Sequence, residues 1–194
     1  MIQMRDVVKL LRVKHYIKNL LIFIPLFFAG KIFDRNLLEK AFIGFVCFCL
    51  ISSAVYILND IQDREKDRLH PKKKMRPIAS GSISVKQGIG LFISCFVGST
   101  LLSLLCLNGI SLFIILLYLV INIAYSIKLK NKPIIDIVIL ASGFVMRIIY
   151  GGAVVDIPIS KWLYLVVVSG ALFMGLGKRR NELTQQKNTR EVLK

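Results

Sequence analysis

The chain has 194 residues, of which 55% are hydrophobic, and its mean hydropathy is +0.65. These values exclude an ordinary soluble domain. A net charge of +16 would suit a nucleic-acid-binding protein, but the basic residues lie in clusters between long apolar runs, and no residue from Gln87 to Ile127 is charged. We therefore interpret the chain as an integral membrane protein that does not bind nucleic acid.

The pattern predicts an all-α protein, a polytopic transmembrane helical bundle that forms one domain over residues 1–194. Residues 1–15 alternate apolar and basic positions at helical spacing, which predicts an amphipathic helix at the membrane interface. Six apolar spans follow, at roughly 16–33, 39–58, 87–107, 110–127, 135–155 and 161–177. Pro25 is expected to kink the first span, and a re-entrant first segment is the alternative. An Asp-rich, basic loop covers 59–86, and a basic tail covers 178–194.

The basic residues also predict the orientation. Most of the 27 Lys and Arg residues lie before the first span, in the 59–86 loop, in the 128–132 connection or in the tail. The connections on the opposite side hold only Lys31, Arg35, Lys40 and Lys161. The positive-inside rule then places both termini and the acidic loop in the cytoplasm, at the cell (inner) membrane.

The stretch YILNDIQDREKDRLHPKKKMRPIASG, residues 56–81, is the strongest candidate site. At about 100° per residue, Asn59, Asp63 and Asp67 share a quarter of the helix circumference, with Asp60 just beyond and Tyr56 one turn earlier. Oxygen ligands so arranged suit Mg²⁺ shared with a phosphorylated substrate. Asn59 and Asp63 are the expected ligands, and Asp60 and Asp67 are expected to hold a second metal or bound waters. The alternative is a solvated helix end whose acids balance nearby bases.

Several cations accompany this motif. One or two of the basic residues that follow it are expected to clamp phosphates, although retention on the inner side or attraction to anionic lipid also explains them. Those residues are Arg64, Arg68, Lys72, Lys73, Lys74 and Arg76. Arg147 lies inside the fifth span, where a charge is costly, and suits an anionic lipid head group. Packing or snorkelling is the alternative for Arg147.

The second connection on the same side offers Tyr125, Lys128, Lys130 and Asp136. They are expected to share the site of the Asp motif, although an interfacial aromatic, an anchoring lysine and a helix cap would explain them equally. Lys178 begins a basic run that closes the sixth span. The sequence has no Ser-His-Asp, Cys-His or Walker-type arrangement.

The motif N-D-x-x-D-x-x-x-D after a membrane helix resembles that of the UbiA-type intramembrane prenyltransferase superfamily. RVKHYIKNLLIF, the 56–81 stretch, AYSIKLKNKPIIDIVILASGFVMRIIYGGA and ALFMGLGKRRNEL resemble, in that order, the decaprenyl-phosphate phosphoribosyltransferase branch. This resemblance implies Mg²⁺-dependent transfer of 5-phosphoribosyl from phosphoribosyl diphosphate to a polyprenyl phosphate, as in cell wall or surface polysaccharide biosynthesis.

The resemblance also implies roles for individual residues. Asn59 and Asp63 would hold the metal, and the catalytic candidates are Asp60, Asp63 and Asp67. Substrate-binding candidates are Lys18, Tyr56, Lys73, Tyr125, Lys130, Arg147 and Lys178. Homo-oligomerisation is left open.

Two departures from the family pattern stand out. The second Asp-rich motif of the aromatic prenyltransferases is replaced by Lys178-Arg179-Arg180-Asn181-Glu182, which favours direct phosphate binding by cations. The branch has about nine helices, and this chain has about six, so the final helices are expected to be absent, as in a fragment, a truncated gene product or a degenerate relative. The alternatives are a prenyltransferase that joins a polyprenyl diphosphate to an aromatic acceptor, a non-catalytic membrane protein and an inactive remnant.

Overall fold

The computed structural model describes residues 3–126 and 133–192. Within these ranges every regular element is helical, which confirms the all-α fold class. The elements are α1 (Met4–Leu11), η1 (Val13–Phe23), α2 (Ile24–Phe28), α3 (Arg35–Gln62), α4 (Arg64–Leu69), η2 (Lys73–Met75), α5 (Pro77–Ser80), α6 (Val85–Cys106), α7 (Gly109–Ala124), α8 (Pro133–Val154) and α9 (Lys161–Val192).

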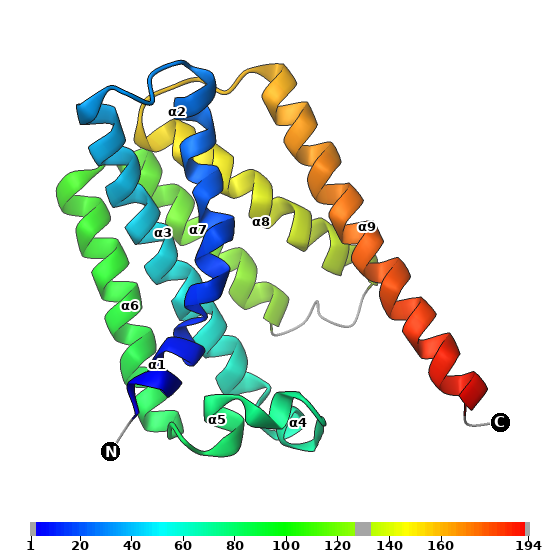
Figure 1. Cartoon of the computed structure of the whole chain (residues 1–194). Helices are drawn as coiled ribbons and strands as arrows, with labels where there is room; N and C mark the ends of the chain where they lie inside the picture. Colours follow the sequence, from blue (N-terminus) through cyan, green and yellow to red (C-terminus); the bar gives the residue numbers. More distant parts are fainter. Residues whose placement is uncertain (1–2, 127–132, 193–194) are drawn as a thin grey trace.

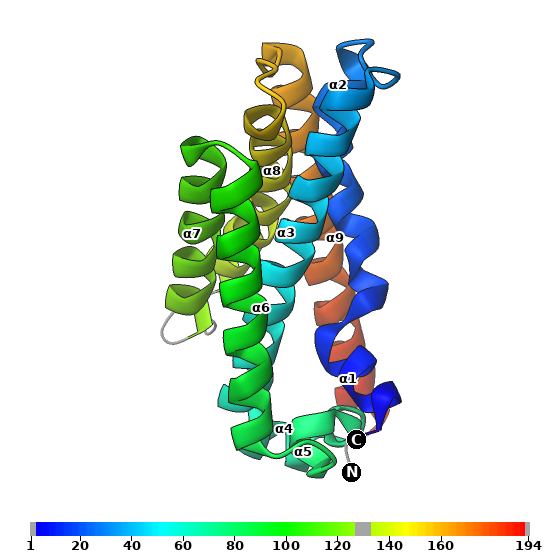
Figure 2. The same cartoon turned by 90° about the vertical axis from the view of Figure 1, so that its left-hand side faces the viewer.

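Helices α6, α7 and α8 form a bundle around α3, and α9 lies on the outer side of α8 (Figures 1 and 2). Helix α3 packs against α6, α7 and α8, and η1 lies against both α3 and α8. Helix α9 packs along α8. The short elements α1, α4 and α5 lie together at one end of the bundle (Figure 2). This end carries the candidate site.

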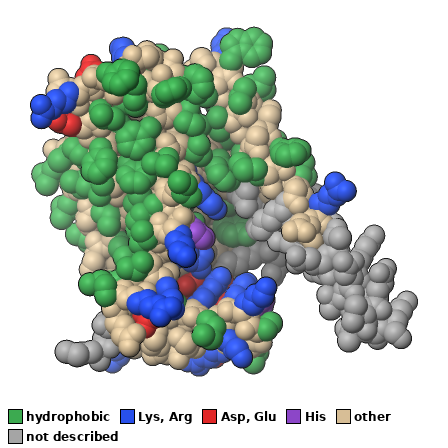
Figure 3. All heavy atoms as spheres, in the orientation of Figure 1, with side chains coloured by type: hydrophobic (Ala, Val, Ile, Leu, Met, Phe, Trp, Pro, Cys, Tyr) green, Lys and Arg blue, Asp and Glu red, His purple; other side chains and the backbone are tan. Residues whose placement is uncertain are grey.

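Among the residues that the structure describes, three helices are long and apolar enough to cross a membrane: α3, α6 and the Ile137–Val154 part of α8. The apolar helices Gly109–Ala124 and Lys161–Gly177 are shorter. On the face seen in Figure 3, hydrophobic side chains cover much of the bundle, and Lys and Arg gather at the end formed by α1, α4 and α5. Helix α9 continues to Val192, so the predicted tail begins inside a helix.

Side-chain caps explain where the long helices begin. Asp34 accepts hydrogen bonds from the backbone N–H groups of residues 36 and 37 at the start of α3. Ser84 and Gln87 form a reciprocal capping box at the start of α6. Asn108 accepts from the Ser111 N–H at the start of α7. Each cap satisfies N–H groups that have no partner within their own helix.

The first predicted span differs from the expectation, because it is a 3₁₀ helix followed by the short α2 rather than one kinked α-helix. Side chains three residues apart line up in a 3₁₀ helix. Tyr16, Asn19 and Ile22 therefore share one face, and Asn19 and Ile22 are buried on it. The Tyr16 and Ser53 hydroxyl oxygens lie 2.8 Å apart, within hydrogen-bond distance. This face fixes η1 against α3 and α8.

Helix α8 approaches η1 so closely that only glycine fits at one position. A Cβ on Gly151 would lie 2.2 Å from the Ile22 carbonyl oxygen. Because that oxygen belongs to the backbone, the clash is relieved only by moving a whole element. Gly151 thus sets the distance between η1 and α8, the two elements that carry the inner end of the candidate site.

Gly151→Ala is expected to destabilise the fold by roughly 1–3 kcal/mol, the usual cost of overpacking. Thermal unfolding of the purified protein in detergent measures this. Gly90→Ala in α6 is the matched control, because its added Cβ meets no atom within 4 Å. Equal melting temperatures for the two variants would contradict the role of Gly151.

Candidate functional site

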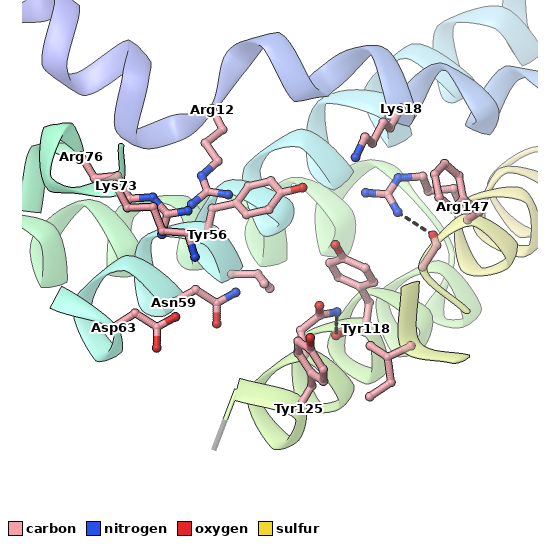
Figure 4. Close-up of a pocket in the computed structure, with 15 residues that line it drawn as sticks. Arg12, Lys18, Tyr56, Asn59, Asp63, Lys73, Arg76, Tyr118, Tyr125 and Arg147 are labelled. Atoms are coloured by element: carbon pink, nitrogen blue, oxygen red, sulfur yellow. Dashed lines mark hydrogen bonds between the residues drawn. The ribbon is translucent and has the colours of Figure 1, made fainter. Parts of the chain in front are cut away.

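A cavity of about 400 Å³ opens at the end of the bundle where α1, α4 and α5 lie (Figure 4). Residues of the N-terminal segment, α3, α7 and α8 form most of its walls. Lys73 of η2 and Arg76, the residue after η2, complete them. The lining residues are Arg12, Lys18, Val55, Tyr56, Asn59, Asp63, Lys73, Arg76, Tyr118, Asn122, Tyr125, Ile139, Gly143, Phe144 and Arg147.

Asn59 and Asp63 lie at one end of this cavity (Figure 4). The Asp63 N–H donates to the Asn59 carbonyl over 2.9 Å, which keeps the two residues one helical turn apart. The Asn59 side-chain oxygen accepts a hydrogen bond from the Ser126 hydroxyl, which ties α3 to the end of α7. Lys73, from the loop after α4, points toward the same end (Figure 4). The predicted grouping of these three residues is present.

Asp60 and Asp67 face away from the cavity and bind arginines. Asp60 accepts from Arg12 over 2.6 Å and from Arg76 over 3.2 Å, and Asp67 accepts from Arg76 over 2.7 Å. The helix is interrupted at Asp63, where φ is −89° and ψ is 1°. Since α4 turns there, Asp67 is directed to the partner of Asp60 instead of continuing the row of Asn59 and Asp63. The even helical spacing of the motif did not predict this separation.

Arg147 forms the opposite end of the cavity (Figure 4). Its side chain is buried and donates to the Asn19 side-chain oxygen over 2.8 Å and to the Gly143 carbonyl over 2.5 Å. The guanidinium lies 4.9 Å from the ring centroid of Phe48 and 5.6 Å from that of Tyr118. These contacts hold the charge in a fixed orientation, and Arg147 faces the bundle interior as a charge inside an apolar span should.

The lining is strongly cationic. Among the described residues it includes Arg12, Lys18, Lys73, Arg76 and Arg147, against the single carboxylate of Asp63. His15 packs edge-on against Tyr56, and partial burial, together with the positive charges of Lys18 and Arg12, lowers the pKa of His15 below its usual 6.5. The imidazole is therefore neutral at pH 7. A cavity of this charge suits an anionic ligand.

The residues present fit one Mg²⁺ ion. Mg²⁺ in proteins takes one or two oxygen ligands from side chains and completes its coordination with substrate phosphates and water. Asn59 and Asp63 supply that number at the cavity. Within residues 3–126 and the described side chains of α8 and α9, no three His, Cys, Asp or Glu residues form a group that could hold a metal without substrate.

The cavity brings together several of the residues that the sequence singled out. Those that line it are Lys18, Tyr56, Asn59, Asp63, Lys73, Arg76, Tyr125 and Arg147. Lys128 and Lys130 lie outside the described residues, and so do the side chains of Asp136 and Lys178. Their predicted roles stay predictions.

Sequence reasoning missed Arg12, Tyr118 and Asn122. Tyr118, Asn122 and the predicted Tyr125 have a usable signal, because they repeat at four- and three-residue spacing on one face of an apolar helix. Residue spacing gives no such signal for Arg12, although it begins the stretch RVKHYIKNLLIF that carries the resemblance. Arg12 lies in a left-handed turn, with φ 54°, between α1 and η1, and the packing of that turn directs its side chain into the site.

Comparison with known proteins gives consistent matches. A model of the UbiA prenyltransferase family matches residues 20–182. The decaprenyl-phosphate phosphoribosyltransferases of Corynebacterium glutamicum and Mycolicibacterium smegmatis are each 37% identical to the chain over 94% of its length. The chain spans 56% and 58% of the length of these two relatives.

A solved structure of a UbiA homolog from Archaeoglobus fulgidus, bound to DMAPP and Mg²⁺, has the same fold. It superposes with a TM-score of 0.71 at 22% identity, over 85% of this chain and 59% of that one.

The ion pairs of Asp60 predict a stability effect. Asp60→Asn leaves Arg12 without its buried counter-charge and Arg76 with that of Asp67 alone, and is expected to cost on the order of 2–3 kcal/mol. Glu65→Gln is the control, because Glu65 is 65% exposed and exposed ion pairs contribute little. Thermal unfolding in detergent should show a lower melting temperature for Asp60→Asn alone. If the melting temperatures of both variants fell by a similar amount, the buried ion pairs would contribute no more to stability than the exposed ones.

Proposed function

The chain belongs to the UbiA prenyltransferase family, and on that premise we propose that it transfers 5-phosphoribosyl from phosphoribosyl diphosphate to a polyprenyl phosphate and releases pyrophosphate. The observation that carries this proposal is a cationic cavity with the metal-ligand pair of Asn59 and Asp63 at one end and a buried arginine at the other. A reaction between two phosphorylated substrates requires two places in the cavity that bind phosphate. The names of the relatives from C. glutamicum and M. smegmatis agree with this choice.

The donor diphosphate lies at the Asn59 end. Asn59 and Asp63 hold Mg²⁺ there, and the ion, when bound, neutralises the diphosphate so that it leaves more easily. Lys73 contacts the donor phosphates from the facing loop, where its ammonium group adds charge that the metal does not supply. These residues thereby fix the ribose C1 at a defined point in the cavity.

The acceptor phosphate lies at the Arg147 end. Arg147 is held by Asn19 and the Gly143 carbonyl, and its charge is compensated by no carboxylate among the described contacts, so it attracts an anionic head group. Lys18, which lines the cavity beside it, adds a second cation (Figure 4). Bound there, the acceptor phosphate has its oxygen directed at the ribose C1.

The transfer itself needs little acid–base chemistry. The bond between C1 and the diphosphate oxygen breaks, the electron pair leaves with pyrophosphate, and an acceptor phosphate oxygen forms the new bond to C1. That oxygen is already ionised at neutral pH, so no residue has to remove a proton. Catalysis then comes from positioning and from the fixed charges of the cavity.

We place the site at the cytoplasmic face of the cell membrane. Lys and Arg gather at the end of the bundle where α1, α4 and α5 lie (Figure 3), and Arg12, Lys73 and Arg76 line the cavity. The positive-inside rule assigns such an end to the cytoplasm, where a soluble donor is available. The apolar helices α3, α6 and α8 make the chain a multi-pass membrane protein, so a lipid acceptor reaches the same cavity from the bilayer.

Asp63→Asn is expected to reduce Mg²⁺-dependent transfer at least 100-fold, because a metal ligand loses its charge. The assay follows label from phosphoribosyl diphosphate into lipid in membranes that contain the full chain. Glu39→Gln, an exposed carboxylate at the other end of α3, should retain full activity. Retained turnover in Asp63→Asn would contradict the metal site. Turnover only with a polyprenyl diphosphate and an aromatic acid would favour the prenyltransferase alternative, and no turnover with either donor pair would favour a non-catalytic protein.

Arg147→Lys is expected to raise the KM for the polyprenyl phosphate about tenfold and to change the KM for the donor by less than twofold. Lysine keeps the charge but loses the planar group that Asn19 and Gly143 orient. Steady-state kinetics with each substrate varied in turn measures both constants. Arg35→Lys, at an arginine that is 90% exposed, is the matched control. A rise in the donor KM instead would reverse the assignment of the two ends.

A further inference from the structure

We propose that Arg12 and Arg76 form a pair of guanidinium groups that bind the donor phosphates directly, and that Asp60 and Asp67 act as positioning residues for this pair rather than as metal ligands. The inference rests on the proposed function for the identity of the donor. The binding of phosphate oxygens by two oriented guanidiniums does not depend on the identity of the donor.

The four side chains form two layers behind the cavity. The carboxylates are the inner layer, with side chains 3% exposed for Asp60 and 4% for Asp67, and neither lines the cavity. The guanidiniums are the outer layer, with side chains 21% exposed for Arg12 and 27% for Arg76, and both line it. The arginines therefore lie between the carboxylates and any ligand.

The hydrogen bonds of Arg12 and Arg76 to the carboxylates leave other N–H groups of both guanidiniums available to a ligand. The bonds to Asp60 and Asp67 use one terminal nitrogen of each arginine, Nη2 of Arg12 and Nη1 of Arg76. A guanidinium has five N–H groups in a planar fork, so the remaining edge of each can donate two parallel hydrogen bonds to a phosphate. Arginine is the residue best suited to such bidentate phosphate contacts.

Arg12 is held in place more firmly than an ion pair alone would require. Its guanidinium carbon lies 4.6 Å from the ring centroid of Tyr56, itself a lining residue. Its backbone has φ 54°, a conformation that residues other than glycine rarely adopt. A left-handed turn at this position directs the side chain from the N-terminal segment across to α3. Backbone conformations of this kind occur where a side chain must be aimed at a site.

The geometry argues against a second metal at Asp60 and Asp67. Each carboxylate already has an arginine in charge-assisted contact, and one oxygen of Asp60 accepts from both arginines. A cation bound to these oxygens would be repelled by two guanidiniums that already contact them. The motif N-D-x-x-D-x-x-x-D thus divides by function, with Asn59 and Asp63 for the metal and Asp60 and Asp67 for the arginines.

The test separates the two contributions by calorimetry on the full chain in detergent, with pyrophosphate and phosphoribosyl diphosphate as ligands, in Mg²⁺ and in EDTA. The arginine pair predicts binding that persists in EDTA. Arg12→Gln should weaken that binding at least tenfold, and Arg12→Lys should restore part of it. Arg5→Gln, at an exposed arginine of α1, should match the wild type.

The carboxylates give the decisive comparison. Asp60→Asn should weaken binding in EDTA and leave the factor by which Mg²⁺ tightens binding unchanged, whereas Asp63→Asn should abolish that factor without weakening binding in EDTA. A melting curve for each variant confirms that it is folded, and Arg76→Lys provides a milder variant should Asp60→Asn not fold. The proposal would be overturned if Mg²⁺ no longer tightened ligand binding to Asp60→Asn, or if Arg12→Gln bound the ligands as tightly as the wild type.

A different result would count against the proposed function instead. If pyrophosphate binding depends on Arg12 but phosphoribosyl diphosphate binds no more tightly and is not consumed, the guanidinium pair stands and the donor has been misassigned.

Discussion

The buried carboxylate of Asp60 joins three stretches of chain that are far apart in the sequence. It accepts from Arg12 in the N-terminal segment and from Arg76 in the loop before α5, and Arg76 also binds Asp67 after the break in the helix. A buried carboxylate without its partners would be strongly unfavourable, so these segments are fixed against the end of α3. The same contacts place two guanidiniums in the wall of the cavity, so one network serves both the fold and the site.

The other end of the cavity depends on close packing rather than on paired charges. Gly151 lets η1 approach α8, and the three-residue period of the 3₁₀ helix then directs Asn19 toward Arg147. Asn19 also donates to Cys49 and lies within 3.4 Å of the Ser52 hydroxyl, so its amide is anchored to α3. Arg147 is thereby held by neutral partners, and its charge remains available to a ligand. This difference between the two ends suits two anionic ligands with different roles.

The chemistry that this cavity supports is limited by repulsion between its substrates. Two phosphorylated molecules that must bring reacting atoms together repel each other, and a wall of fixed cations offsets that repulsion more effectively than water can. The site supplies the cations on elements that packing holds rigid: Arg12 beside Tyr56, Arg147 beside Phe48 and Tyr118. Such preorganised charge needs no general base, which agrees with the absence of a catalytic histidine arrangement in the sequence.

The sequence by itself determined the helical class, the main apolar helices and the local group of Asn59, Asp63 and Tyr56. Neighbours within one helix follow from its period, and a buried charge such as Arg147 must face the interior wherever its helix packs. The tertiary structure decided which charges pair. Asp67 turns from the cavity because the helix breaks at Asp63, and Asp60, still inside α3, turns to Arg12 and Arg76. Arg12 reaches the site through a left-handed turn that local spacing does not predict. Partner choice among many charges depends on how distant segments pack, and local spacing carries no information about that.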